Sequence, residues 1–375
     1  MFLLKSKGLL GKLVKNIVTD DTADNKEAVL QRNDLKYLRY RGKIIRNIEL
    51  HHLPFGTPIT DTSKRFTNTL IKLANLVHRD TRPYVIQNNL FFKKGDKVFP
   101  YLLADNERFL RDLEYIGDAR IMIRRIPGIN DSVDIVVVTK DVLSIGGSFQ
   151  MSSTSRYKLA IREANLGGWG DKIEGRMLYD SRRNNKIGAG IEYVRRNIMG
   201  SFIDGYFGWQ SITPTIIGGW EQERTLYARF NKPLIHPYMK WTYALEVAQH
   251  KTVNQYQPDS IFKKDYNYSY YNVDAWGAFT TQAGQSSRTR ADDRLRTLIG
   301  LRVVKQQFQE LPERYDNSYF FRYYDITAVL GSLSLFRQDF YKTRYIYGFG
   351  RTEDVPEGID ASITTGWTRK QQRTR

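Results

Sequence analysis

The sequence contains no cysteine. Disulfides, thiolate catalysis and cysteine-based zinc sites are therefore excluded. It also contains no run of about 18 apolar residues, and this absence excludes a transmembrane helix. A transmembrane β-strand is not excluded, because it needs only about 10 residues of alternating character. The mean hydropathy of −0.51 is compatible with strands of this kind.

Motifs that would indicate an enzyme are missing as well. The sequence has no G-x-x-x-x-G-K-[ST] phosphate loop and no G-x-S-x-G nucleophile turn. The segment Gly188-Ala189-Gly190 lacks the third glycine of a dinucleotide fingerprint and lies in an expected strand. No histidine pair has the spacing of a zinc site, and we expect the histidines to be loop or surface groups. The histidines are His51, His52, His78, His236 and His250.

Two pairs of neighbouring carboxylates, Asp292-Asp293 and Glu353-Asp354, have the residue types needed for calcium binding or acid–base catalysis. Both pairs lie beside arginine in expected loops, which favours solvated salt bridges. We therefore expect a protein that is not an enzyme and has no catalytic residue, cofactor or metal site.

The net charge of +18 first suggests nucleic acid or anionic lipid as a partner. The basic residues are scattered, and pairs such as Arg182-Arg183, Arg195-Arg196 and Lys263-Lys264 fall between expected strands. This pattern is typical of solvated loops or of a wet interior. A soluble all-β nucleic-acid-binding protein would need aromatic and basic residues on one sheet face, and here they lie mostly on opposite faces. We therefore expect no nucleic-acid partner.

Residues 1–42 are polar, and we expect an N-terminal helix followed by a linker. Lys5, Lys7 and Lys12 interrupt the apolar stretch 1–14, and no small-x-small cleavage site follows it. The stretch therefore resembles a short amphipathic helix rather than a secretion signal. If the protein is exported, we expect the reading frame to be incomplete at its N-terminus.

Residues 43–141 have the pattern of a small α+β domain with the element order β-α-α-β-β. A strand at 43–50 is followed by an insertion at 52–80, in which residues 62–78 have helical character. Two helices and two strands joined as a hairpin then follow. They are expected within 83–92, from 100 to 113, at 119–126 and around 133–138. Two helices can cover one face of such a three-stranded sheet.

From residue 143 onward, helical spacing gives way to alternation with a period of two residues. Each alternating segment has one apolar face and one face of charged, polar or glycine residues. A soluble β-sandwich alternates in the same way. Long segments, apolar faces that end in tyrosine or tryptophan, and alternating short and long linkers favour a transmembrane barrel of about 11 or 12 strands. The segments are 145–152, 156–162, 172–179, 187–193, 240–247, 294–303 and 359–367.

Four segments closely resemble the last POTRA domain of the BamA-like outer-membrane assembly superfamily. Two further elements, NLGG at 165–168 and RTEDVP at 351–356, resemble a turn between early barrel strands and a loop of the same superfamily. The resemblance covers roughly residues 43–367. The four POTRA-like segments are LFFKKGD at 90–96, YLLADNERFLR at 101–111, IGDARI at 116–121 and DSVDIVVVTKDV at 131–142.

This resemblance implies three regions, namely residues 1–42, a periplasmic POTRA-like domain at 43–141, and an all-β antiparallel transmembrane barrel at 142–375. It implies a location in the Gram-negative outer membrane and a non-enzymatic role in the insertion, assembly or translocation of proteins. The implied partners are outer-membrane lipid, unfolded or extended client proteins, and accessory lipoproteins. A dedicated secretion pore or porin-like channel remains an alternative that the sequence does not separate from this role.

The sequence departs from the superfamily pattern in two ways. The expected Arg-Gly-aromatic motif does not occur, since Arg41-Gly42 is followed by Lys43. The last residues, 368–375, contain no apolar closing strand and no terminal aromatic residue. We therefore expect an incomplete barrel, because a closed barrel leaves no strand edge in lipid.

The strand expected at 119–126 is the one feature with a mechanistic interpretation. In a small sheet it should be exposed along one side, and an exposed edge can accept an extended client through main-chain hydrogen bonds. Ala119, Ile121 and Ile123 are therefore the candidate client-binding residues. In the alternative interpretation, the edge is merely covered or is blunted by charge. The charged residues that would blunt it are Arg120, Arg124 and Arg125.

Overall fold

The computed structural model divides the chain into two compact units, neither of which is one continuous segment. The first unit comprises residues 1–73, 90–142 and 337–359, and the second comprises 74–89, 143–336 and 360–375. The helices expected at 1–14 and 62–78 lie outside the residues that the structure describes. The described residues are 34–53, 79–236, 239–281, 295–316, 318, 320–344 and 352–371.

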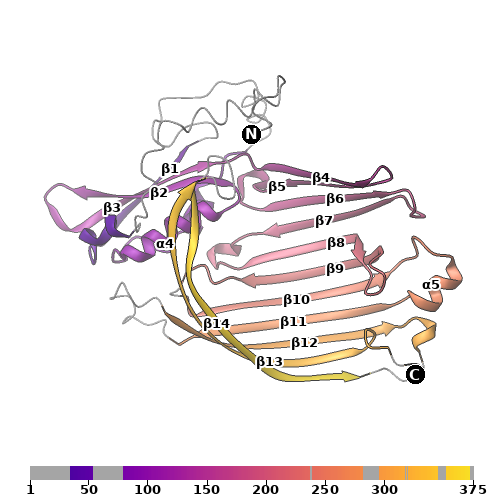
Figure 1. Ribbon diagram of the computed structural model, residues 1–375. Coiled ribbons are helices and arrows are strands. Elements are labelled where there is room, and N and C mark those ends of the chain that lie inside the picture. The colour runs from indigo at the N-terminus through magenta and orange to yellow at the C-terminus, as the bar shows by residue number, and fades with distance from the viewer. Residues whose placement is uncertain are drawn as a thin grey trace. The chain divides into compact units, whose positions relative to one another are not determined.

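The first unit contains a three-stranded sheet with the strand order β1-β3-β2 (Figure 1). The central strand is β3 (Ile129–Asp141), which pairs in parallel with β1 (Ile44–Leu53) and antiparallel with β2 (Ile116–Ile126). Helix α4 (Pro100–Asp112) packs on β2, and the short 3-10 helix η2 (Leu35–Tyr40) packs on α4. Along the chain, α3 (Pro83–Asn88) and α4 separate β1 from β2, so the elements follow the expected order β-α-α-β-β.

The core of the first unit lies between α4 and one face of the sheet. Alternate residues of the two paired strands point into it, including Ile121 on β2 together with Val133 and Val137 on β3. Leu103 and Leu110 of α4 are buried at helical spacing. Each such side chain contributes on the order of 1.5–3 kcal/mol when it leaves water, so this alternation is sufficient to fix which face of the sheet is covered.

Helix α3 groups with the second unit, which corrects the expectation that two helices cover the three-stranded sheet. Hydrogen bonds explain the difference. The Asn165 side chain donates to Thr81 Oγ1 at 2.9 Å, and the Arg82 amide donates to the Gly168 carbonyl at 3.0 Å. At the other end of α3, the Asn197 side chain donates to the Asn88 carbonyl at 2.9 Å. Gly168, with φ of +78°, also approaches Asp80 so closely that a Cβ would collide with its carbonyl oxygen.

The second unit is built on an antiparallel sheet in which each strand pairs with its neighbours along the chain (Figure 1). The sheet has 11 strands, in agreement with the expected number, and parts of its last two strands group with the first unit. The strands are β4 (Ile145–Ser153), β5 (Arg156–Glu163), β6 (Lys172–Asp180), β7 (Ile187–Arg195), β8 (Asp204–Pro214), β9 (Glu221–Lys232), β10 (Trp241–Thr252), β11 (Ser269–Thr280), β12 (Arg296–Glu310), β13 (Asp325–Arg344) and β14 (Thr352–Gln371).

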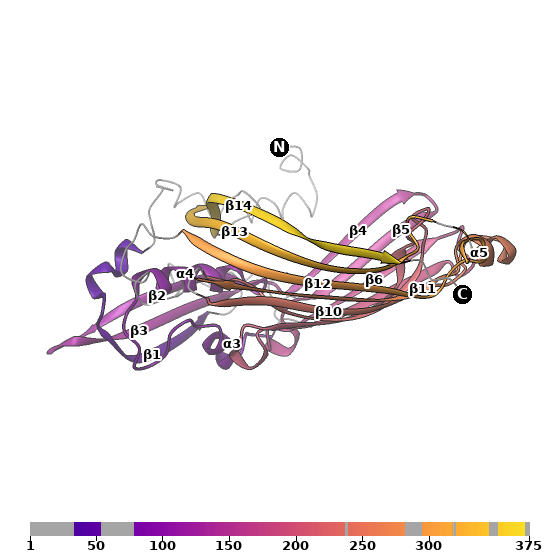
Figure 2. The same cartoon turned by 90° about the horizontal axis from the view of Figure 1, so that it is seen from below.

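Short helices occupy some of the connections between these strands. They are η3 (Leu166–Gly168), η4 (Ile198–Gly200), α5 (Asp259–Asp265) and η6 (Glu313–Tyr315). No helix among the described residues is long and apolar enough to cross a membrane. Among the described strands, β4 and β14 each have only one neighbour, so the 11 strands form an open sheet. The curvature of this sheet is visible from below in Figure 2.

An ionic network covers the face of the three-stranded sheet opposite its core. The Arg46 guanidinium binds Asp134 through contacts of 2.9 and 2.6 Å. Arg124 also contacts Asp134, at 3.3 Å, and it binds Glu49. The hydrogen bonds from Arg46 lower the pKa of Asp134 although burial opposes them, and the hydrogen bond from Arg124 lowers the pKa of Glu49.

The lowered pKa values predict how this sheet responds to acid. Unfolded carboxyl groups titrate near about pH 4, so the network stabilises the folded state above that pH, and its contribution is lost as the pH falls through the lower folded-state pKa values. We expect Asp134→Asn to lower the melting temperature at pH 7 and to have a smaller effect at pH 3. Thermal unfolding followed by near-ultraviolet circular dichroism measures this, and an equal effect at both pH values would contradict it.

Candidate functional site

The free edge of β2 is the structural counterpart of the predicted client-binding strand. In the order β1-β3-β2, only one side of β2 has a neighbouring strand among the described residues. Ala119 and Ile121 have buried side chains, and Ile123 is half-buried. Since strand residues alternate, the main-chain groups of all three face the side away from β3. The prediction that these residues lie on a strand with one free edge is therefore confirmed among the described residues, and their use by a client stays a prediction.

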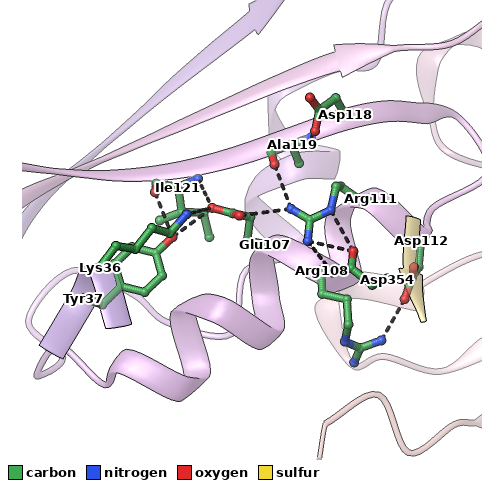
Figure 3. Close-up of polar contacts among 10 residues, drawn as sticks. All are labelled: Lys36, Tyr37, Glu107, Arg108, Arg111, Asp112, Asp118, Ala119, Ile121 and Asp354. Atoms are coloured by element: carbon green, nitrogen blue, oxygen red, sulfur yellow. Dashed lines mark hydrogen bonds and ion pairs between the residues drawn. The ribbon is translucent and has the colours of Figure 1, made fainter. Parts of the chain in front are cut away.

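Side chains already occupy the main-chain groups at two of these residues (Figure 3). The Ile121 amide donates to Glu107 Oε2 at 2.8 Å, and the Tyr37 hydroxyl donates to the Ile121 carbonyl at 2.8 Å. Arg111 Nη1 donates to the Ala119 carbonyl at 3.2 Å. We call Tyr37, Glu107 and Arg111 the edge cap. Because the edge cap binds groups that an added strand would use, it closes β2 at Ala119 and Ile121.

The edge cap contains two charges that are almost completely buried. Glu107 is 0% exposed and Arg111 is 1% exposed. They are four residues apart on α4, and the Arg111 guanidinium therefore reaches Glu107 Oε1 at 3.0 Å. Tyr37 and Lys36 also donate to Glu107, at 2.9 and 2.7 Å. Burial raises the pKa of Tyr37, and the charge of Glu107 raises it further, so Tyr37 remains a protonated donor.

Asp354 of β14 completes the environment of Arg111 (Figure 3). Arg111 Nε and Nη2 donate to the two oxygens of Asp354, both at 2.9 Å. Such a bidentate pair is among the stronger polar contacts in proteins. Burial lowers the pKa of Arg111, but the charges of Asp354 and Glu107 outweigh it and leave the pKa raised. Arg111 therefore stays charged in a place from which water is excluded.

Sequence reasoning did not identify the edge cap. Tyr37 was assigned to a polar linker, and Asp354 was expected in a solvated salt-bridge patch. That expectation is wrong for Asp354, whose side chain is only 4% exposed because it binds Arg111. Asp292 and Asp293 lie outside the described residues. One signal was present, since Glu107 and Arg111 share the helical face of Leu103 and Leu110, where charge is rare unless it is paired.

The large sheet of the second unit presents an apolar face that is exposed. Phe149 is 66% exposed, Ile161 and Leu301 are 58% exposed, and Leu226 is 56% exposed. The strand register places these residues on one side of the sheet, which we call the apolar face. Further exposed members of this face are Met177, Ile191, Trp209, Leu245, Val247, Val303 and Leu333.

The opposite side of the same sheet, which we call the polar face, carries ion pairs between strands. Lys172 and Arg176 contact Glu174 at 3.1 and 2.6 Å, and both also approach Glu192 on β7. Farther along the sheet, Arg229 lies 3.6 Å from Glu246, and Arg302 donates to Asp274 at 2.9 Å. Charge on this side of the sheet is therefore largely compensated by partners on the same or a neighbouring strand.

One end of the polar face holds an aromatic cluster with a buried carboxylate. Tyr268, Phe308 and Tyr323 pack together, and the Tyr268 hydroxyl donates to Glu223 Oε2 at 2.6 Å. His250 Nδ1 lies 2.6 Å from Glu223 Oε1. His250 is thus a half-buried member of a polar cluster rather than the loop or surface group expected from sequence. Burial, followed by the charge of Glu223, raises the pKa of Tyr268.

Comparisons with known proteins give structural likenesses only. No protein-family model matches the chain, and no curated protein matches it. BamA from Haemophilus ducreyi lacking POTRA domains 1–3 aligns over 86% of this chain and 72% of its own, at 10% identity and a TM-score of 0.35. CdiB from Acinetobacter baumannii aligns over 97% and 84%, at 9% identity and a TM-score of 0.37. CdiB from Escherichia coli aligns over 88% and 74%, at 9% identity and a TM-score of 0.30. Scores of this size carry no argument about function.

The edge cap predicts which part of β2 is protected from solvent exchange. Glu107→Ala removes the acceptor of the Ile121 amide and leaves Arg111 with a missing partner, which costs roughly 3–5 kcal/mol. We expect hydrogen exchange in peptides covering β2 to become at least about tenfold faster. Asp112→Ala is the matched control, because Asp112 lies on the same helix and pairs with Arg108 from an exposed position outside the edge cap. Equal exchange in the two variants would contradict the role of the cap.

Proposed function

We propose that this chain is an outer-membrane protein of the BamA-like superfamily that assists insertion, assembly or translocation of client proteins. In this proposal the large sheet lies in the outer membrane of a Gram-negative cell, and the first unit is a periplasmic POTRA-like domain. The protein acts by binding its clients and has no catalytic activity. The observation that supports this proposal most directly is the exposed apolar face.

The apolar face is too extensive for a protein surrounded by water. Soluble monomers rarely expose continuous apolar patches larger than a few hundred Å². Here exposed apolar side chains run from Phe149 on β4 to Leu333 on β13, and their exposure to water costs roughly 25 cal/mol for each Å². Acyl chains remove this cost. The antiparallel ladder meanwhile pairs the main chain of each inner strand, as lipid requires.

The polar face suits a wet interior for the same reason. A charged side chain that faces lipid near the bilayer centre costs at least about 2.5 kcal/mol. The charges of Lys172, Arg176, Glu192, Arg229 and Asp274 are instead on the side opposite the apolar residues, and they pair with one another or with adjacent strands. An apolar exterior with a polar interior is the arrangement of transmembrane β-barrels.

Two neighbouring valines on β12 allow a matched test of the membrane orientation. Val303 pairs across the strands with Ala275 on the apolar face, and Val304 pairs with Asp274 on the polar face. We expect Val303→Arg to impair insertion into phosphatidylcholine vesicles, at a cost of about 2–4 kcal/mol. Val304→Arg places the same charge beside Asp274 and should insert normally. Folding yield is measured by heat-modifiable electrophoretic mobility, and equal yields for the two variants would reject the orientation.

The proposed cellular role has a direct test in the source organism. Depletion of the full-length protein should lower the levels of outer-membrane proteins generally, because clients would lose their route into the bilayer. Quantitative proteomics of outer-membrane fractions measures this effect. Unchanged levels of these proteins, together with loss of one secreted protein and steady conductance in planar bilayers, would favour the dedicated secretion pore instead.

A further inference from the structure

Arg111, which caps the free edge of β2, also binds Asp354 on another strand. Arg111 supplies one donor to the Ala119 carbonyl and another to Glu107, and its remaining donors bind Asp354. Glu107 in turn binds the Ile121 amide. The edge, the cap and β14 therefore form one chain of hydrogen bonds, and all of its members belong to the first unit.

Asp354 is not the only group that joins the neighbouring strands β13 and β14 to α4. The Arg108 guanidinium lies 3.9 Å from the ring centroid of Phe340 on β13. Arg108 and Arg111 are three residues apart and therefore lie on neighbouring positions of the helix surface. Arg108 and Arg111 of α4 thus contact β13 and β14, and both of these strands belong to the 11-stranded sheet.

The charges expected to blunt the edge of β2 are largely engaged elsewhere. Arg124 binds Glu49 and Asp134 on the other face of the sheet. Arg125 lies over the ring of Tyr40, with its guanidinium 5.5 Å from the ring centroid. What prevents pairing at Ala119 and Ile121 is therefore the edge cap rather than free charge on the strand.

We propose that Arg111 and Asp354 form a latch that keeps the free edge of β2, the predicted client-binding strand, closed to an extended peptide segment. The proposal rests on the proposed function, which supplies extended clients. When Asp354 moves away, the buried guanidinium of Arg111 loses a bidentate partner and turns toward water. Glu107 then loses its own partner and releases the Ile121 amide, so that an incoming strand can pair with Ala119, Ile121 and Ile123.

The kind of partner follows from the groups that the latch releases. They are main-chain donors and acceptors, so the partner is recognised by its extended backbone rather than by one side chain. Arg120 lies between Ala119 and Ile121, is not among the arginines engaged elsewhere, and disfavours a basic residue directly opposite it. The surface therefore fits an uncharged or acidic segment in which apolar and polar residues alternate.

A binding experiment tests the latch without disrupting the fold. Asp354→Asn keeps the shape of the side chain and removes its charge, and Tyr37→Phe removes one hydroxyl of the cap. Asp360→Asn, at an exposed position of the same strand, is the matched control. The probe is a short fluorescent peptide that alternates valine with threonine, and its dissociation constant is measured by anisotropy on the full chain in detergent.

We expect Asp354→Asn and Tyr37→Phe to bind the probe about tenfold more tightly than the wild type, since each weakens a contact that competes with it. Asp360→Asn should bind like the wild type, and a probe with N-methylated alternate amides should not bind. Hydrogen exchange of β2 shows independently whether the cap has opened. If exchange rises and affinity does not, or if the N-methylated probe binds equally well, the proposal is wrong. Failure of the Val303 and Val304 test would instead reject the membrane role and leave this result unaffected.

Discussion

Main-chain groups at a strand edge must find partners, and this constraint governs both units. In the large sheet, each strand from β5 to β13 has a neighbour on both sides. In the small sheet, side chains take the place of a neighbour, because Glu107, Tyr37 and Arg111 bind the main chain of β2. Two of these side chains carry buried charge, so closure of the small sheet depends on Asp354, which lies elsewhere in the chain.

Buried charge makes the edge cap sensitive to the loss of any member. An ion pair that is removed from water gains little net stability, whereas a single charge left without its partner costs several kcal/mol. Glu107 and Arg111 also bind main-chain groups of β2 that apolar side chains would leave without partners. They are well suited to a contact that must open as a unit, because the release of one partner destabilises the others.

The large sheet separates its side chains by chemistry. Exposed apolar residues occupy one face, and charged residues such as Arg176, Arg229 and Arg302 pair with carboxylates on the opposite face. Arg176, Arg229 and Arg302 contact carboxylates on the same or a neighbouring strand rather than forming one basic surface, as nucleic-acid binding would need.

The sequence by itself determined the features that depend on neighbouring residues. Alternation with a period of two located seven of the 11 described strands of the large sheet, and β8, β9, β11 and β13 were not located individually. The order β-α-α-β-β was readable from spacing. Only the tertiary structure decided the rest. Helix α3 groups with the second unit because residues at its two ends form hydrogen bonds with Asn165 and Asn197. The edge of β2 is capped by Tyr37, Glu107 and Arg111, and Arg111 also binds Asp354, which is 243 residues away. Periodicity is a local property of a chain, whereas the pairing of buried charges depends on which distant segments the fold brings together.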